Sequence, residues 1–112
     1  MRILLGITGG IAAYKAANLI RGLSELGHQV TVVPTENALR FIGKPTLEAL
    51  SGHAIETDMY EDVAQVRHVE LGQQADLILI APATASFIAR FAAGIADDLM
   101  LNAILASKAP VI

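Results

Sequence analysis

The chain has 112 residues and a formal net charge of −3, with 54% hydrophobic residues, 4% aromatic residues and no cysteine. This length suits one domain with a modest core, and without cysteines these residues hold no disulfide, thiolate metal site or cysteine nucleophile. Charges of both signs are interspersed, and no apolar run reaches the roughly 18 residues of a membrane span. We therefore expect no nucleic-acid partner and no membrane partner, and a cytoplasmic location is the simplest interpretation.

The chain opens with a strand, a glycine turn, a helix and a second strand. Residues 2–8 form an apolar run, residues 11–26 carry apolar side chains at helical spacing, and residues 29–33 form a second apolar run that ends at Pro34. The apolar stripe expected of the helix comprises Ile11, Ala12, Tyr14, Ala16, Leu19, Ile20, Leu23 and Leu26. Because such a βαβ unit crosses over with a right hand, the two strands are predicted to be parallel.

The middle of the chain predicts short, weakly marked elements. In order, they are helices at 35–41 and 45–50, an edge strand at 54–57, a loop or weak helix at 58–66, and a turn or short helix at 68–74. Thr35 is a candidate cap for the helix at 35–41, because its hydroxyl can accept a hydrogen bond from a free backbone amide.

The last third returns to long apolar elements. In order, they are a strand at 77–81 that Pro82 ends, helices at 86–93 and 97–106, and the start of a strand at 108–112. The run at 77–81 is typical of a strand buried on both faces. The alternation of strands and helices predicts an α/β fold, a three-layer α/β/α Rossmann-like (flavodoxin-like) arrangement with a parallel sheet. We expect one domain over residues 1–112 that stops after about the fifth strand, as a part of a longer protein.

Two turns at the carboxyl ends of expected strands are candidates for ligand binding, because ligands of open α/β sheets bind there. Gly9 and Gly10 follow the first strand, where backbone amides at a helix start can hold a phosphate; the alternative is a tight turn without a ligand. The dinucleotide fingerprint would need further glycines at Ile11 and Tyr14, so Glu36 is only a weak sign of an NAD ribose site. A mononucleotide such as FMN fits better.

The second turn consists of Pro82, Ala83, Thr84, Ala85 and Ser86, between the strand at 77–81 and the next helix. Small side chains and hydroxyls there would let a flat ring lie against the backbone. Alternatively, Thr84 or Ser86 simply caps the helix, and both interpretations can hold together.

His68 lies just upstream of the strand at 77–81, and we expect it to face the same crevice. An imidazole there can act as a general base, although a lone histidine is more often structural or exposed. His28 and His53 are interpreted as ordinary loop histidines. Asp97 and Asp98 could be a metal pair, but no third ligand follows nearby, so we expect no metal and interpret Asp97 as a helix cap.

Four segments in this order and spacing identify a resemblance. They are GGIAAYK at 9–15, PTENALRF at 34–41, HVELGQQADLILIAPATA at 68–85 and AAGIADDL at 92–99. Together they resemble the FMN-dependent phosphopantothenoylcysteine decarboxylases, which belong to the flavoprotein family of homo-oligomeric cysteine decarboxylases. In bacteria such a domain is commonly the first half of a bifunctional coenzyme A biosynthesis protein with a fused synthetase.

The resemblance implies an FMN site and an active-site histidine. The implied FMN contacts are Gly9, Gly10 and Ile11 at the first turn, Thr35 and Asn37 near the phosphate or ribityl chain, and Thr84, Ala85 and Ser86 beside the isoalloxazine ring. His68, in its His-x-Glu-Leu setting, matches the family's base in substrate oxidation. The family assembles as trimers or multiples of trimers, and FMN lies between subunits.

The resemblance also implies the reaction. It is the decarboxylation of 4′-phosphopantothenoylcysteine to 4′-phosphopantetheine, in which flavin oxidises the cysteine moiety to a thioaldehyde before CO₂ leaves. A relative acting on a peptidyl cysteine, a prenyl-flavin synthase and a non-catalytic flavin-binding subunit are the alternatives. Many relatives have Asn at the position of Ser86, and their substrate-clamping Pro-x-Met-Asn segment and catalytic Cys lie beyond the residues matched here.

Overall fold

The computed structural model describes residues 1–57 and 62–112, with side chains outside 62–65. The elements are β1 (Arg2–Ile7), a 3₁₀ turn η1 (Ile11–Lys15), α1 (Ala16–Glu25), β2 (Gln29–Pro34), a 3₁₀ turn η2 (Asn37–Arg40), α2 (Lys44–Ser51), α3 (Asp62–Gln74), β3 (Leu77–Ile80), α4 (Ala85–Ala92) and α5 (Leu99–Leu105). Within the described ranges, no helix has the length and apolar character needed to cross a bilayer.

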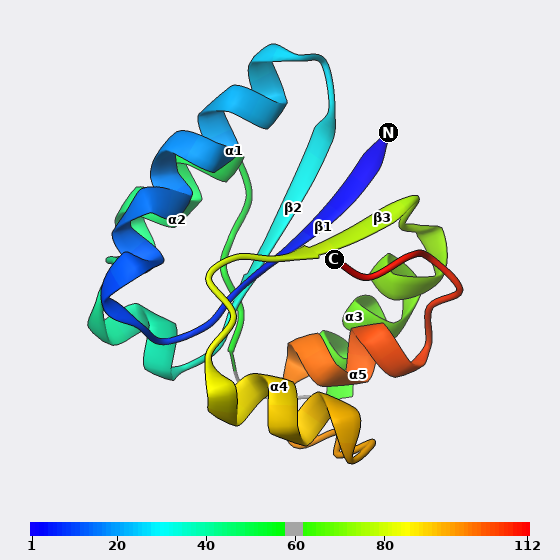
Figure 1. The fold of residues 1–112 in the computed structure, drawn as a ribbon. Helices are drawn as coiled ribbons and strands as arrows, with labels where there is room; N and C mark the ends of the chain where they lie inside the picture. Colours follow the sequence, from blue (N-terminus) through cyan, green and yellow to red (C-terminus); the bar gives the residue numbers. More distant parts are fainter. Residues whose placement is uncertain (58–61) are drawn as a thin grey trace.

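The three strands form one parallel sheet in the order β2-β1-β3 (Figure 1). In this register Ile3 of β1 lies between Val30 and Leu77. Helices cover both faces: α1 and α2 pack on one, and α3, α4 and α5 on the other (Figure 1). Successive β1 side chains point to opposite faces of the sheet. Leu5 therefore packs in the core beneath α1 and α2, and Leu4 packs in the core beneath α3, α4 and α5. The predicted three-layer α/β/α fold is confirmed.

The strand predicted at 77–81 is present as β3, but the expectation that it is buried on both faces is wrong. In β3 only Ile78 is buried, whereas every residue of β1 after Arg2 is buried. The reason is position in the sheet. β1 has a full partner strand on each side, while the other edge of β3 pairs, among the described residues, only with residues 110–112.

The segment predicted as a strand at 108–112 is present only as the beginning of a ladder. Val111 forms an isolated parallel bridge with Ile78. Backbone hydrogen bonds join Ile78 to Pro110 and Ile112, and Ile80 to Ile112, at 2.8 to 2.9 Å.

The single helix predicted at 11–26 is instead the 3₁₀ turn η1 followed by α1. In a 3₁₀ helix, residues three apart share one side. Ile11 and Tyr14 therefore face outward, 82% and 58% exposed, while Ala13 and Ala16 face the core. The expected stripe was also wrong at its far end, where Leu26 is 75% exposed.

The edge strand predicted at 54–57 is absent. Ile55 is buried, but its backbone amide donates to the Glu48 carboxylate at 3.3 Å instead of to a strand. The facing amide of β2, on Val32, donates to the side chain of His53 at 3.0 Å. A side chain thus takes the hydrogen bond that a further strand would need, and His53 is not the ordinary loop histidine that the sequence suggested.

The remaining helix predictions were partly correct. The helices predicted at 45–50 and 86–93 are α2 and α4, within one residue at each end. The helix predicted at 35–41 is only the short turn η2. The turn predicted at 68–74 belongs to the thirteen-residue α3, and of the segment at 58–66, residues 58–61 lie outside the described residues. The helix predicted at 97–106 is α5, two residues later at its start.

Candidate functional site

A cavity of about 530 Å³ opens at the carboxyl ends of β1 and β2, and we call it the site cavity. Its lining residues are Thr8, Gly9, Pro34, Thr35, Glu36, Asn37, Thr57, Thr84, Ser86, Arg90, Asp97, Asp98 and Leu99. They come from the loops after all three strands, from α4, from the beginning of α5 and from Thr57. The cavity therefore lies where parallel α/β sheets place their ligands.

Thr8 joins the loops that follow β1 and β3. Its side chain is buried, and its hydroxyl donates a hydrogen bond to the carbonyl of Pro82 at 2.6 Å while accepting one from the backbone amide of Thr84 at 2.8 Å. Both hydrogen-bonding functions of the hydroxyl are therefore used. With the bond from the Thr8 backbone amide to Pro82 at 3.2 Å, these contacts bring the two loops that the sequence singled out to the same wall of the cavity.

Gly9 lies in the closest contact of the cavity. A Cβ built at this position would come within 2.3 Å of Asn37 Nδ2 and 2.8 Å of the Asn37 carbonyl carbon. Only glycine therefore lets the segment after β2 pack over the first turn. Thr35 holds that segment, because its hydroxyl accepts from the Ala38 amide at 3.2 Å. The N-cap of η2 is Glu36, however, and not Thr35 as predicted.

Thr84 caps α4, as the sequence predicted. Its hydroxyl accepts from the Phe87 amide at 3.2 Å, which leaves Ser86 free of the capping role. Ser86 is exposed and lines the site cavity. A polar hydroxyl and a helix start thus meet on the wall opposite Asn37.

Arg90 forms the charged corner of the cavity, and the sequence reasoning missed it. Its guanidinium donates to Asp97 at 2.9 Å and to Asp98 at 3.1 Å, and it lies 5.6 Å from the ring centre of Phe87. Burial lowers the pKa of Arg90, but the hydrogen bonds and charges of the two carboxylates raise it more, so the pKa lies above its usual value. No spacing rule pairs a helix residue with acids seven and eight positions later.

The two aspartates have different tasks. Asp98, not Asp97 as predicted, caps α5: its Oδ1 accepts from the Leu101 amide at 2.7 Å. Both carboxylates also form ion pairs with Arg90. The described residues contain no group of three or more potential metal ligands.

His68 lies elsewhere, contrary to the expectation that it faces the same crevice. It is 4% exposed on α3 and lines a second cavity of about 380 Å³, between α3 and β2. His53, Glu56 and Arg67 line this second cavity too, and Glu56 pairs with Arg67. α3 continues through the segment expected to be a short turn, and this places His68 beside the strands rather than beyond their carboxyl ends.

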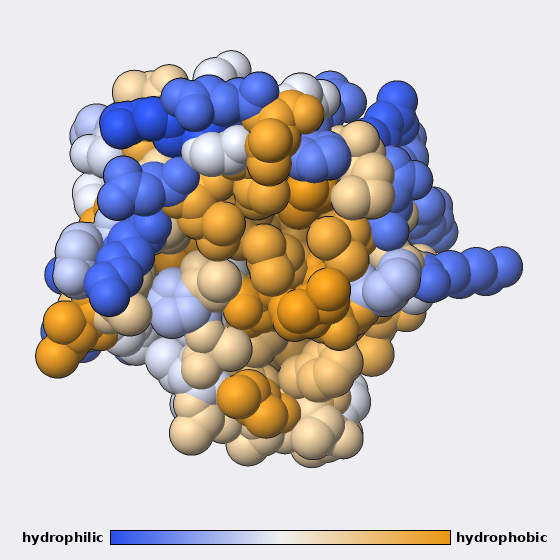
Figure 2. Space-filling view, turned by 45° about the horizontal axis from the view of Figure 1, so that its top comes forward, coloured by the Kyte–Doolittle hydropathy of each residue, from blue (hydrophilic) through white to orange (hydrophobic). Residues whose placement is uncertain are grey.

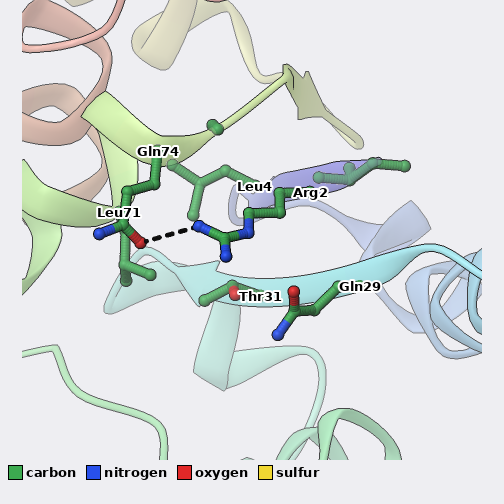
Figure 3. A pocket seen from close by; sticks show the side chains of 8 residues that line it. Arg2, Leu4, Gln29, Thr31, Leu71 and Gln74 are labelled. Carbon is green, nitrogen blue, oxygen red and sulfur yellow. Dashed lines mark hydrogen bonds between the residues drawn. The ribbon is translucent and has the colours of Figure 1, made fainter.

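A smaller hollow of about 140 Å³ lies at the amino ends of β1 and β2 (Figure 3). In it Arg2 points toward Gln74 of α3 and donates to its side-chain carbonyl at 3.3 Å (Figure 3). The backbone amide of Arg2 also donates to Asp76 at 2.7 Å. These contacts fasten the beginning of β1 to the residues before β3, which is a structural task.

The structure thus brings together most of the expected FMN contacts. Those that line the site cavity are Gly9, Thr35, Asn37, Thr84 and Ser86. Gly10 is adjacent, since a Cβ there would lie 3.8 Å from Thr84 Cγ2. Ile11 and Ala85 are exposed beside the cavity without lining it. Besides Arg90, the sequence reasoning missed Thr8 and Thr57, which are ordinary residues in sequence and are recognised only from their contacts.

Comparison with known proteins gives concordant results. A sequence profile of the flavoprotein family matches residues 1–112. The coenzyme A biosynthesis bifunctional protein CoaBC of Mycolicibacterium smegmatis is 56% identical over 111 residues, which are 99% of this chain and 27% of that protein. CoaBC of Vibrio vulnificus is 50% identical over 98% of this chain and 28% of its own length. The chain thus spans little more than a quarter of these curated relatives.

Solved structures show the same likeness. The FMN-dependent cysteine decarboxylase SpaF superposes with a TM-score of 0.87 at 36% identity, covering 99% of this chain and 65% of that one. A PPC decarboxylase mutant complexed with pantothenoylaminoethenethiol gives 0.84 at 31% identity, covering 98% and 63%. With a family match over its whole length and these relatives, the chain belongs to the flavoprotein family.

Proposed function

We propose that the chain binds FMN in the site cavity and is the flavin-binding part of a phosphopantothenoylcysteine decarboxylase in coenzyme A biosynthesis. The observation that carries the proposal is the meeting of the Gly9 turn, the segment at Thr35 and Asn37, and the loop at Thr84 and Ser86 around one cavity. The names of the relatives support the same activity. Residues 1–112 would then form one FMN-binding domain.

The residues present fit the cofactor. Gly9 has no side chain of its own to keep a phosphate away from the backbone of the first turn. The wall at Thr84 and Ser86 offers hydroxyls and little bulk for a flat ring. Thr35 and Asn37 would hold the phosphate or ribityl chain, with Gly10 and Ile11 completing the first turn and Ala85 the ring wall. The positive charge of Arg90 partly neutralises the negative charges of Asp97 and Asp98, so that the two carboxylates repel a bound phosphate less.

Bound FMN would supply an acceptor for the hydride that the substrate's cysteine moiety gives up, and the protein would position it and move protons. We propose His68 as the base. Because His68 lines the second cavity within one copy, we also propose that the site is completed where copies of the chain meet, in a homotrimer or a multiple of it. The activity is that of a cytoplasmic lyase whose substrate is small, with a fused synthetase as in the bifunctional relatives.

The test begins with colour. The purified full-length protein should carry the two visible absorption bands of flavin and should release CO₂ from phosphopantothenoylcysteine. His68→Asn should keep the absorption bands and lose CO₂ release. His28→Asn changes a loop histidine whose ring contacts the terminal amine of Met1, and it should keep both the bands and CO₂ release. Sedimentation should give a multiple of three chains. A colourless protein that takes up no added FMN would contradict the proposal.

A further inference from the structure

His53 connects the free edge of β2 to the loop after α2. The Val32 amide donates to His53 Nε2 at 3.0 Å, and His53 Nδ1 lies 2.9 Å from the carbonyl oxygen of Ala54. A neutral imidazole has one donor and one acceptor nitrogen. Since Nε2 accepts, Nδ1 carries the proton and donates to Ala54. These two hydrogen bonds determine the tautomer of His53, and they hold the backbone of Ala54, where the following segment begins.

That segment, residues 54–57, is the wall segment between the two cavities. Ile55 anchors it: the side chain is 2% exposed in the same core cluster as Val32 and Leu47. The next two residues face different spaces, because Glu56 lines the second cavity and Thr57 lines the site cavity. Any movement of the wall segment would therefore change the shape of the site cavity.

The wall segment has few other connections to β2. The Ile55 amide bonds to Glu48 of α2, and the Glu56 side chain pairs with Arg67 of α3. Neither of these contacts reaches the strand. Among the hydrogen bonds of the described residues, the one from Val32 to His53 connects the β2 backbone directly to the residue before the wall segment.

We propose that His53 is a positioning residue for the cofactor site: it holds the wall segment against β2 and so sets the place of Thr57 in the site cavity. The proposal rests on the proposed function for the identity of the ligand, FMN. His53 lines the second cavity and is not part of the site cavity, so it acts on the ligand only through the wall segment.

The contact is sensitive to protonation. A doubly protonated imidazole has no acceptor, so its Nε2–H would face the N–H of Val32 and the contact would break. The charged and titratable groups around His53 are Glu56, Arg67 and His68 in the same cavity and Glu48 at the neighbouring amide. Because His68 is a second imidazole in the same cavity, the contribution of His53 must be read as a difference between variants.

The experiment measures the FMN dissociation constant of the full-length protein by flavin fluorescence between pH 5 and 8. His53→Ala removes the acceptor, His53→Gln keeps an acceptor oxygen on a side chain of similar reach, and His28→Gln controls for loss of a histidine elsewhere. At pH 8 we expect His53→Ala to weaken binding by about five- to tenfold, the effect of one hydrogen bond, while both glutamine variants stay near wild type. Between pH 8 and 5 wild type should lose more affinity than His53→Gln does.

A second measurement does not depend on FMN. The ¹⁵N spectrum of the imidazoles should show His53 with a protonated Nδ1, and the Val32 amide should exchange with solvent faster in His53→Ala than in His28→Gln. Unchanged FMN affinity in His53→Ala, equal weakening in both His53 variants, or an Nε2–H tautomer would each overturn the proposal. If wild type binds no FMN, the proposed function fails, and tautomer and exchange still decide whether His53 holds the wall segment.

Discussion

The hydroxyl group of Thr8 joins the loops after β1 and β3 through two hydrogen bonds. Replacing Thr8 by valine keeps the shape and removes the hydroxyl. The partly buried Thr84 amide then loses its partner, and the Pro82 carbonyl keeps only the backbone amide of residue 8 at 3.2 Å. We expect Thr8→Val to lower the free energy of unfolding by about 1–3 kcal/mol. Urea denaturation measures this change, and the same variant should also bind FMN more weakly.

Thr8→Ser is the matched control, because serine keeps the hydroxyl and loses one methyl group. It should retain most of the stability and of the FMN affinity. If the serine and valine variants were equally destabilised, the packing of the methyl group rather than the hydrogen bonds would explain the effect.

At the scale of elements, two helical glycines differ in their surroundings: Gly72 lies in a close contact between helices, and Gly22 faces open space. A Cβ on Gly72 of α3 would lie 2.1 Å from the Ala103 carbonyl oxygen of α5, whereas a Cβ on Gly22 of α1 meets no described atom outside its helix within 4 Å. Gly72→Ala should therefore push α3 and α5 apart and destabilise the fold by about 1–3 kcal/mol. Gly22→Ala should stabilise it by about 0.5–1 kcal/mol. Thermal unfolding of the two variants side by side tests this, and a neutral Gly72→Ala would contradict the close helix contact.

The short helix α5 depends on its cap. Asp98 accepts from the Leu101 amide and pairs with Arg90, while Asp97 only pairs with Arg90 and its side chain is 56% exposed. We expect Asp98→Ala to lower the free energy of unfolding by about 0.5–2 kcal/mol and Asp97→Ala by less than about 1 kcal/mol. Chemical denaturation distinguishes the two. If Asp97→Ala instead lowered the free energy of unfolding more than Asp98→Ala does, Asp97 would be the cap, as the sequence suggested.

At the scale of the whole molecule, apolar side chains remain at the surface. Figure 2 shows them gathered in the middle of one face, with hydrophilic residues along its upper and left margins. In Figure 1 β3 and the C-terminal residues are drawn with no helix in front of them. Among the exposed large hydrophobic residues are Ile11, Tyr14 and Ile112. A surface of this kind agrees with the proposal that copies of the chain associate.

Binding of FMN at the junction of all three strand ends should stabilise the whole fold. A ligand that binds only the folded state adds about 2.7 kcal/mol when its free concentration is 100 times the dissociation constant. We expect FMN at that excess to raise the free energy of unfolding by about this amount, as measured by denaturation with and without it. Gly9→Ala should reduce the effect, because its Cβ would displace Asn37. An equal effect of FMN on both proteins would place the ligand elsewhere.

Local sequence signals predicted the parts of this protein that depend on nearest neighbours. The apolar runs of β1 and β2 and the capping hydroxyl of Thr84 follow from the residues themselves. The cap acts on an amide only three positions away, so it can be predicted locally. The same signals named Gly9, Thr84 and Ser86 among the residues that line the site cavity, because strand ends and glycine turns mark that edge of an α/β sheet. Thr35 and Asn37 were expected there only from the family resemblance.

Contacts between distant segments decided the rest. The side chain of His53 accepts the hydrogen bond that a further strand would accept from the edge of β2. Because α3 is long, His68 lies in the second cavity. Arg90 pairs with two aspartates that lie beyond the turn after α4. Each outcome depends on which groups the folded chain brings within hydrogen-bonding distance. The sequence by itself thus determined the α/β alternation of β1, α1, β2 and β3 and the edge of the sheet at which the site cavity lies. Only the tertiary structure decided which side chains meet there, because packing, not spacing, sets those distances.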